Sequence, residues 1–165
     1  MKLGIMSDSH GRVTEVRRAL AVLDGAGAEV FVHCGDVGGL EVLEELAGRH
    51  CWFVWGNMDR PQPTWRTHPR VSELPWPRGQ VEITLAGKRI AVCHGHEPGL
   101  RHIISCGKYD YVLHGHTHQR EDYLVGPTRV VNPGALHRAA LHTVAVLDLD
   151  NDRLEFLGLD GNTLS

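Results

Sequence analysis

Five short polar motifs carry most of the side chains that could do chemistry. In chain order they are D-S-H (residues 8–10), G-D-V-G (35–38), G-N-M-D (56–59), C-H-G-H (93–96) and H-G-H-T-H (114–118). Carboxylates, imidazoles and one amide oxygen suit Mn, Fe, Zn or a related divalent ion, whereas a structural zinc site would use cysteines. The donors are too many for one tetrahedral ion. They fit two ions roughly 3.5–4 Å apart, an arrangement that activates water and clamps a phosphoryl group.

Each motif alone has an ordinary structural explanation. Asp8 could cap the first helix, Asp36 could cap the second helix or a turn, and Asn57 could be a turn residue. A single His-Gly-His could be a hydrogen-bonded surface pair. All five motifs occur in order, however, and each follows an apolar strand, which favours one shared site.

The elements that must position these motifs alternate between strand and helix in the first part of the chain. Apolar runs at 2–7, 30–36 and 51–57 predict buried strands, and the patterns at 12–24 and 40–48 predict helices. Strand–helix–strand units imply parallel strands with right-handed crossovers. The carboxyl ends of parallel strands meet at one edge of a sheet, where ligands bind, so the polar residues should converge there.

The second part of the chain favours antiparallel β structure. We expect a hairpin over 81–95, a short helix over 98–106, a strand over 109–115, two strands around Gly126-Pro127 and a closing hairpin over 142–159. Residues 60–80 hold five of the eight prolines and predict a surface excursion.

Size and composition narrow the class of protein. The 165 residues predict a single domain spanning 1–165, and a net charge of −3 argues against long nucleic acid as a partner. We find no apolar run of membrane-spanning length and expect a cytoplasmic protein without a membrane partner. The cysteines are widely spaced and are predicted to be buried thiols: Cys34, Cys51, Cys93 and Cys106.

Taken together, the five motifs resemble those of the calcineurin-like metallophosphoesterases, and more closely their small, stand-alone YfcE-type phosphodiesterase branch. The resemblance spans nearly the whole chain and includes V-N-P-G at 131–134. It implies an α/β (α+β) fold, a four-layer αββα sandwich of two mixed β-sheets flanked by helices. It also implies a metal-dependent phosphodiesterase in which a metal-activated hydroxide attacks phosphorus in line.

The resemblance implies two divalent ions per chain, with Mn favoured and Fe, Zn, Ni or Co as alternatives. By motif, Asp8, His10 and His118 would bind the first ion. Asn57, His94 and His116 would bind the second, and Asp36 would bridge both.

One position departs from the family. Many relatives have histidine directly after Gly-Asn, as general acid or phosphate ligand, and here it is Met58. We hypothesise that the enzyme prefers activated phosphodiesters, or that His96 partly substitutes, touching substrate or orienting a ligand. Asp59 is a further candidate for the catalytic set, or a turn residue, and Arg60 is a candidate substrate contact along with Asn57 and His96.

Three alternative functions match parts of the motif pattern or of the implied fold. A metallo-β-lactamase is set aside because Gln119 and Arg120 replace the Asp-His that its motif requires. A protein-interaction scaffold remains possible, since a retromer subunit resembles this fold, and so does a nuclease that acts on short oligonucleotides.

The excursion at 60–80 could be a lid in which arginines meet phosphate, but we favour a surface loop that packs its tryptophans on the body. A homodimer or higher homo-oligomer is compatible with the sequence. In the run H-G-H-T-H, His114 is expected to support the site without binding metal.

Overall fold

The computed structural model describes residues 1–164, which form eleven strands, three α-helices and one 3-10 helix in two sheets. The first sheet has the order β11-β10-β9-β1-β2-β3. Strands β1 (Lys2–Met6), β2 (Val30–His33) and β3 (Cys51–Phe53) are parallel, and helices α1 (Val13–Gly25) and α2 (Leu40–Leu46) connect them. This confirms the strand–helix alternation predicted for the first part of the chain.

The second sheet has the order β4-β5-β6-β8-β7 and corrects one expectation. Hairpins join β4 (Val81–Leu85) to β5 (Lys88–Val92), and β7 (Arg120–Val125) to β8 (Thr128–Pro133). The inner strands β5, β6 (Tyr111–Leu113) and β8 are parallel, however, with α3 (Leu100–Ser105) crossing between β5 and β6. The expectation of antiparallel structure in the second part of the chain is therefore wrong for these inner strands, although it holds for the two hairpins. The local sequence pattern predicts the hairpin between β7 and β8. It does not show that β8 also pairs with β6 on its other side.

The closing hairpin belongs to the first sheet. Strand β9 (Thr143–Asp148) lies antiparallel to β1, and β10 (Arg153–Gly158) follows it at the sheet's far side. A two-residue strand, β11 (Thr163–Leu164), pairs with β10 and was not predicted.

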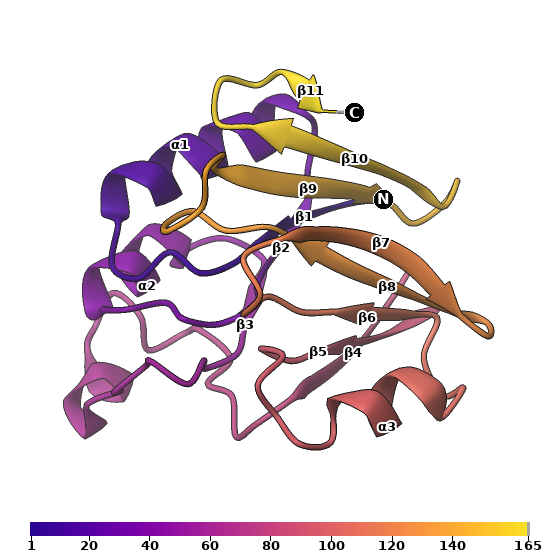
Figure 1. Cartoon of the computed structure of the whole chain (residues 1–165). Coiled ribbons are helices and arrows are strands. Elements are labelled where there is room, and N and C mark those ends of the chain that lie inside the picture. Colours follow the sequence, from indigo (N-terminus) through magenta and orange to yellow (C-terminus); the bar gives the residue numbers. More distant parts are fainter. Residues whose placement is uncertain (165) are drawn as a thin grey trace.

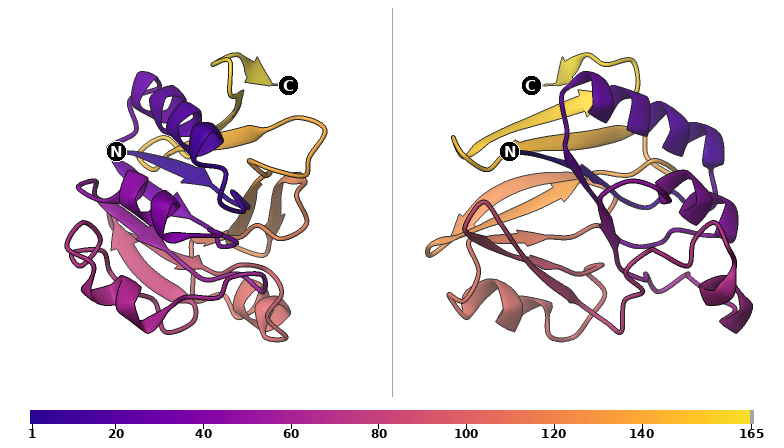
Figure 2. Two further views of the ribbon diagram at one scale, coloured as in Figure 1. Left: turned by 90° about the vertical axis from the view of Figure 1, so that its left-hand side faces the viewer. Right: turned by 180° about the vertical axis from the view of Figure 1, so that it is seen from behind.

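Figures 1 and 2 show α1 and α2 beside the first sheet and α3 beside the second. Side chains that alternate along the strands hold these layers together. Leu3 and Ile5 of β1 point between the sheets and meet residues such as Ile90 and Leu113, whereas Met6 points to the opposite face, toward α1 and α2. Helix α3 covers the outer face of the second sheet through Ile104. Two helices on one side and one on the other give the predicted αββα sandwich.

The excursion at 60–80 packs against the body. It contains the 3-10 helix η1 (Pro63–Thr67), and Val71 and Leu74 are buried beside α2. Trp76 lies with its ring centroid 5.6 Å from that of Trp55. The Arg70 guanidinium lies 3.3 Å from a Glu44 carboxylate oxygen. These contacts favour the packed surface loop over the lid.

Two further expectations can be judged from burial and helix length. Cys34, Cys51 and Cys93 are buried as predicted, but Cys106 is exposed because it follows the last residue of α3 at the surface. Within residues 1–164, we find no helix long and apolar enough to cross a membrane.

Candidate metal centre

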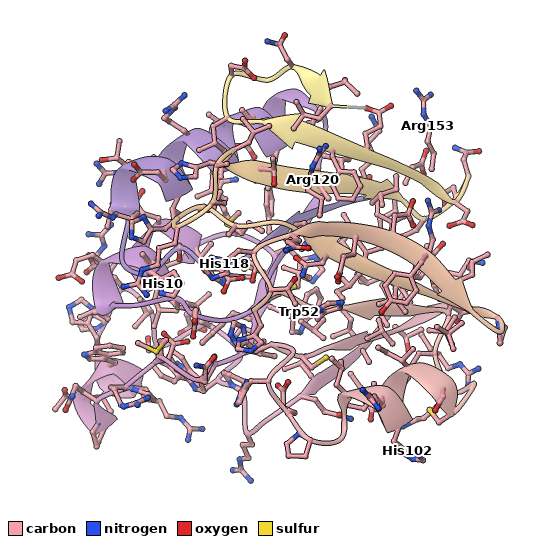
Figure 3. The ribbon with its side chains drawn as sticks, in the orientation of Figure 1. His10, Trp52, His102, His118, Arg120 and Arg153 are labelled. Carbon is pink, nitrogen blue, oxygen red and sulfur yellow. The ribbon has the colours of Figure 1, made fainter. Side chains whose placement is uncertain are left out.

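The polar motifs meet at one edge of the sandwich, where β1, β2 and β3 of one sheet and β5 and β6 of the other end. Backbone hydrogen bonds tie the loops together: the Asp8 amide donates to the Gly35 carbonyl (3.0 Å) and the Gly115 amide donates to the His94 carbonyl (2.8 Å). Figure 3 shows His10 and His118 near each other at this edge, although 108 positions separate them in the chain. The convergence predicted from parallel strand ends is confirmed.

One group of candidate ligands consists of Asp8, His10 and His118. The His118 Nε2 atom lies 3.1 Å from Asp8 Oδ1, and His10 Nε2 lies 4.0 Å from the same oxygen. The two Nε2 atoms are 3.4 Å apart. These are the residues that the resemblance assigns to the first ion.

A second group contains Asp8, Asp36 and His94. His94 Nε2 lies 3.5 Å from Asp36 Oδ2, 4.0 Å from Asp8 Oδ1 and 3.1 Å from Asn57 Oδ1. The His116 ring centroid lies 5.1 Å from that of His94, so His116 stands at the rim of this group. All seven predicted ligands are thus gathered, with Asp8 common to both groups.

Backbone carbonyls orient two of the imidazoles. His94 Nδ1 lies 2.8 Å from the Cys34 carbonyl oxygen, and His118 Nδ1 lies 3.3 Å from that of Arg138. Because a carbonyl can only accept, each Nδ1 carries the proton and donates it. In the neutral rings each Nε2 then presents a lone pair to the site, as in metal-binding histidines.

One atom tests whether these residues fit a cation. Asp8 is fully buried, and its Oδ2 accepts from Ser7 Oγ (2.6 Å) and the His116 amide (3.0 Å). Its Oδ1 has no hydrogen-bond partner among residues 1–164. A buried carboxylate oxygen without a donor is costly. Lone pairs of His94, His118 and Asp36 surround it, so a divalent ion would satisfy a set of electron-pair donors that lacks protons.

Burial and close neighbouring groups shift the pKa values of the inner residues of the site. Burial alone would raise the pKa of Asp36, but the His94 imidazole and the Met58 amide outweigh it and hold the pKa at about 2. Burial lowers the pKa of His94, yet Asp36 and the Cys34 carbonyl reverse this and raise it. Burial dominates at His10 and lowers its pKa. The carboxylate is therefore ionised at neutral pH, as a ligand must be.

The backbone at the site is strained, and the sequence did not predict this strain. Eight non-glycine residues in the described part of the chain have positive φ, and five of them are predicted ligands: Asp8 (55°), His10 (46°), Asp36 (51°), His116 (71°) and His118 (59°). Such backbone costs roughly 1–3 kcal/mol per residue and clusters at functional sites. The tight turns aim successive side chains at one point.

Two glycines let the loops approach closely. A Cβ atom on Gly56 would lie 2.0 Å from Asp36 Oδ1, and one on Gly115 would lie 1.9 Å from Ser7 Oγ. Any larger residue would displace the carboxylate of Asp36 or the serine that supports Asp8. The glycines in G-N-M-D and H-G-H-T-H therefore contribute to the geometry.

Asp59 and Arg60 hold the loop that carries Asn57. The carboxylate of Asp59 accepts from the amides of Gly38 (2.7 Å), Gly56 (2.8 Å) and Val37 (3.1 Å). Its oxygens are engaged with backbone, so we interpret Asp59 as a positioning residue and not as a catalytic one. Arg60 is exposed, and its Nη1 donates to the carbonyls of Asn57 (2.9 Å) and Asp59 (2.7 Å).

His96 stands at the rim. Its ring centroid lies 5.4 Å from that of His94, and its side chain is 37% exposed, enough to meet a substrate from solvent. Met58 is 53% exposed at the opposite loop. Glu97, which the sequence analysis missed, accepts from the amides of His94 (2.9 Å) and Gly95 (2.7 Å) and so fixes the loop that carries both histidines.

Two more supporting residues were missed. Asn132 is fully buried and donates to the Gly115 carbonyl (3.0 Å) and to Thr117 Oγ1 (2.9 Å), which shapes the loop before His118. His33 is also fully buried, and its Nε2 lies 2.8 Å from Ser9 Oγ. Asn132 could have been found from the sequence, because it lies in the V-N-P-G run that resembles the family. His33 could not, because a histidine at the end of an apolar strand has no distinctive pattern around it.

His114 lies beneath the site. It is 3% exposed, with Nε2 3.2 Å from a Glu121 carboxylate oxygen and Nδ1 3.1 Å from the Gly115 carbonyl. It belongs to neither candidate ligand group. Its role, as a support of the site or as a neutral histidine at a strand end, stays a prediction.

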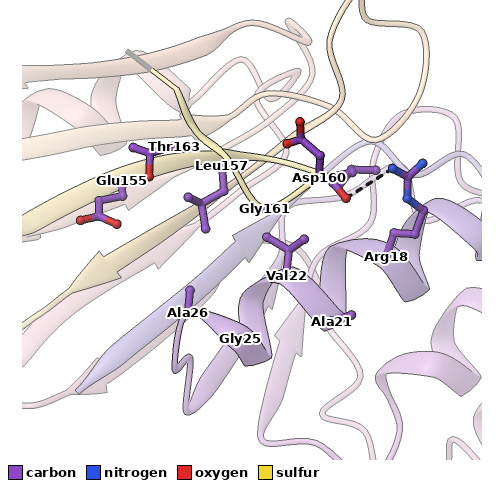
Figure 4. Close-up of a pocket in the computed structure, with 11 residues that line it drawn as sticks. Arg18, Ala21, Val22, Gly25, Ala26, Glu155, Leu157, Asp160, Gly161 and Thr163 are labelled. Carbon is purple, nitrogen blue, oxygen red and sulfur yellow. Dashed lines mark hydrogen bonds between the residues drawn. The ribbon is translucent and has the colours of Figure 1, made fainter.

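A separate cavity lies away from the candidate metal centre. It measures about 590 Å³ and lies between α1 and the strands β10 and β11, as Figure 4 shows. Its polar wall includes Arg18, whose Nη2 donates to the Leu159 carbonyl (3.3 Å), and Asp160. It contains none of the predicted site residues.

Comparisons with known proteins agree with this geometry. Residues 1–152 match the family model described as the calcineurin-like phosphoesterase superfamily domain. The phosphodiesterase MJ0936 of Methanocaldococcus jannaschii is 28% identical over 156 residues, which covers 91% of this chain and 94% of the relative.

Solved structures give the same result. An archaeal phosphodiesterase superimposes with a TM-score of 0.84 at 27% identity, covering 96% of this chain and 99% of the other. The phosphoesterase YfcE from E. coli gives 0.76 at 25% identity, over 100% and 97% of the chains. Vps29 of Entamoeba histolytica, solved with zinc, shares the fold with a TM-score of 0.68 at 21% identity, over 99% and 96%.

Proposed function

The chain belongs to the calcineurin-like phosphoesterase superfamily, and from that premise we propose that it is a phosphodiesterase that holds two divalent ions at the strand-end site. One observation carries the proposal: the fully buried, unpartnered Oδ1 of Asp8, with Nε2 atoms of His118 at 3.1 Å and of His10 and His94 at 4.0 Å. A bound cation would satisfy this oxygen, for which residues 1–164 provide no hydrogen-bond donor.

The proposed ligands are Asp8, His10 and His118 for one ion, Asn57, His94 and His116 for the other, and Asp36 between them. The N and O donors are compatible with Mn, Fe, Zn, Ni and Co, and we propose Mn first because the family resemblance favours it. Bound divalent ions would supply charge neutralisation of the phosphate and a lowered pKa of water.

The protein's own residues do the positioning. Asp59 locks the Asp36 and Asn57 loops together through three backbone amides, while Glu97 and Asn132 lock the loops of His94 and His118. A site that is held rigidly before substrate arrives needs no rearrangement during the reaction.

The site has no histidine at the position where many relatives have a general acid that protonates the leaving group. Met58 cannot transfer a proton, and His96 is the exposed imidazole nearest to His94 and His116, with ring centroids at 5.4 and 6.2 Å. We assign His96 as the group that assists departure of poor leaving groups. His96→Ala should then slow alkyl-ester substrates more than p-nitrophenyl esters. An equal rate for wild type and variant on both would refute this role.

The central experiment measures metal content together with activity. Chelator-treated protein is reloaded with Mn²⁺ and assayed for bound metal and for hydrolysis of phosphodiesters, phosphomonoesters and cyclic nucleotides. We expect two ions per chain and the highest rate on phosphodiesters.

Asp8→Asn should lower metal binding and reduce the rate at least about a hundredfold. Mutating a residue that only hydrogen-bonds to a metal ligand already lowers metal affinity or activity by about 10–100-fold. Asp150→Asn is the control, because the β9–β10 turn lies at the amino end of β1, away from the site. A metal-loaded protein that hydrolyses no phosphodiester would instead favour the protein-interaction scaffold.

A further inference from the structure

A groove beside the metal centre has no role in the function described so far. It measures about 520 Å³, and its lining includes His118, Arg120, Ala140, Leu141 and Phe156. His118 lines this groove with part of its surface while its Nε2 lies 3.1 Å from Asp8 Oδ1. The groove therefore shares His118 with the candidate metal centre, and Figure 3 labels Arg120 and His118 in one view.

The lining of the groove combines apolar side chains with one cationic side chain. Ala139, Ala140 and Leu141 come from the loop after β8, and the Leu141 side chain is 52% exposed. Arg120 and Phe156 also line the groove, and the Arg120 guanidinium lies 5.6 Å from the centre of the Phe156 ring. Guanidinium planes and aromatic faces stack on flat rings, and exposed leucine gains by contact with apolar surface.

The shared histidine brings the groove next to the position proposed for phosphorus. In-line displacement removes one substituent of a diester and leaves the other ester group on phosphorus. Because His118 lines the groove and also lies 3.1 Å from Asp8 Oδ1, the groove is close enough to the candidate metal centre to receive that second group.

We propose that this groove binds the retained ester group of a phosphodiester, and that the preferred group is an uncharged planar ring. The proposal rests on the function proposed above and adds the substrate class to it. A phosphomonoester has no retained ester group, so the proposal predicts a preference for diesters.

The test separates ring recognition from hydrolysis. Mn²⁺-loaded wild type is assayed on p-nitrophenyl phenyl phosphate and p-nitrophenyl methyl phosphate, which share a leaving group. Calorimetry measures binding of phenylphosphonate and methylphosphonate, which are not hydrolysed. We expect about a tenfold preference for phenyl over methyl in both measurements, within the range that apolar pockets achieve.

Two variants act on the groove from opposite directions. Leu141→Ser removes an apolar wall and Ala140→Phe fills the space, and each should reduce the phenyl preference to about twofold or less. Leu124→Ser is the matched control, since Leu124 is also exposed (69%) but lies on β7 outside this groove. It should keep the wild-type preference.

The outcomes distinguish the two proposals. If wild type hydrolyses both diesters equally and binds both phosphonates equally, the groove proposal is wrong and the phosphodiesterase proposal stands. An unchanged phenyl preference in both groove variants would also overturn it. If wild type hydrolyses neither diester, the proposed function itself fails.

Discussion

His33 should make the protein's stability fall on mild acidification, although it is not a proposed ligand. Its Nδ1 accepts from the Gly35 amide (3.3 Å), so its Nε2–H donates to Ser9 Oγ, which in turn donates to the Val37 carbonyl (3.0 Å). Protonation would place N–H against N–H at Gly35 and bury an unpaired charge. Burial is the main cause that lowers the pKa of His33 from 6.5 to about 3.

The sign and size of the effect follow from proton linkage. Between the folded pKa of about 3 and the unfolded value of 6.5, the unfolded chain binds a proton that the folded protein does not. Stability contributed by neutral His33 is thus complete above 6.5 and is lost as the pH falls. The loss is about 1.4 kcal/mol per pH unit, or about 2 kcal/mol between pH 7 and pH 5.

The assay compares wild type with His33→Gln, which retains a donor near Nε2 but does not titrate. Urea unfolding is followed by tryptophan fluorescence at several pH values, with chelator present because metal ligands add their own pH dependence. His10 and His114 also have lowered pKa values, owing to burial, but contribute equally to both proteins.

The measured quantity is therefore the difference between the two pH slopes. We expect the variant's free energy of unfolding to change by about 2 kcal/mol less than that of wild type over this interval. His102→Gln, at an exposed position on α3, is the control for removing one histidine and should keep the wild-type slope. Identical slopes for wild type and His33→Gln would refute the reasoning.

Three other substitutions test the site and its surroundings. Asp59→Ala should lower the free energy of unfolding by roughly 3 kcal/mol in urea denaturation, because three backbone amides lose their acceptor; a loss below about 0.5 kcal/mol would contradict this. His118→Ala should lose dinuclear binding in metal analysis, whereas His114→Ala should retain two ions, and an empty site in His114→Ala would reverse our assignment. The double variant Arg66→Ala, Arg70→Ala should keep the wild-type KM, because residues 60–80 pack on the body of the protein and Arg70 pairs with Glu44. A raised KM would instead support the hypothesis that these residues form a lid over the substrate.

The sequence was sufficient to predict the layered fold and the meeting point of the polar residues. Apolar runs alternating with helical stripes define parallel strands, and right-handed crossovers bring their carboxyl ends to one edge. Asp8, Asp36 and Asn57 each follow such a strand, so their proximity was a consequence of chain order. The histidines after β5 and β6 were assigned to the same edge because they too follow apolar strands, although the parallel pairing of these two strands was not predicted.

The tertiary structure decided what depends on contacts between distant segments. The Cys34 carbonyl selects the tautomer of His94 from 60 positions away, and burial beside Ser9 and Gly35 makes His33 a neutral support. The parallel pairing of β6 with β8 is likewise non-local. The sequence itself determined which residues can bind metal, because chemistry and strand ends are local properties. Their protonation, their strained backbone and the groove beside His118 arise when separate loops pack against one another.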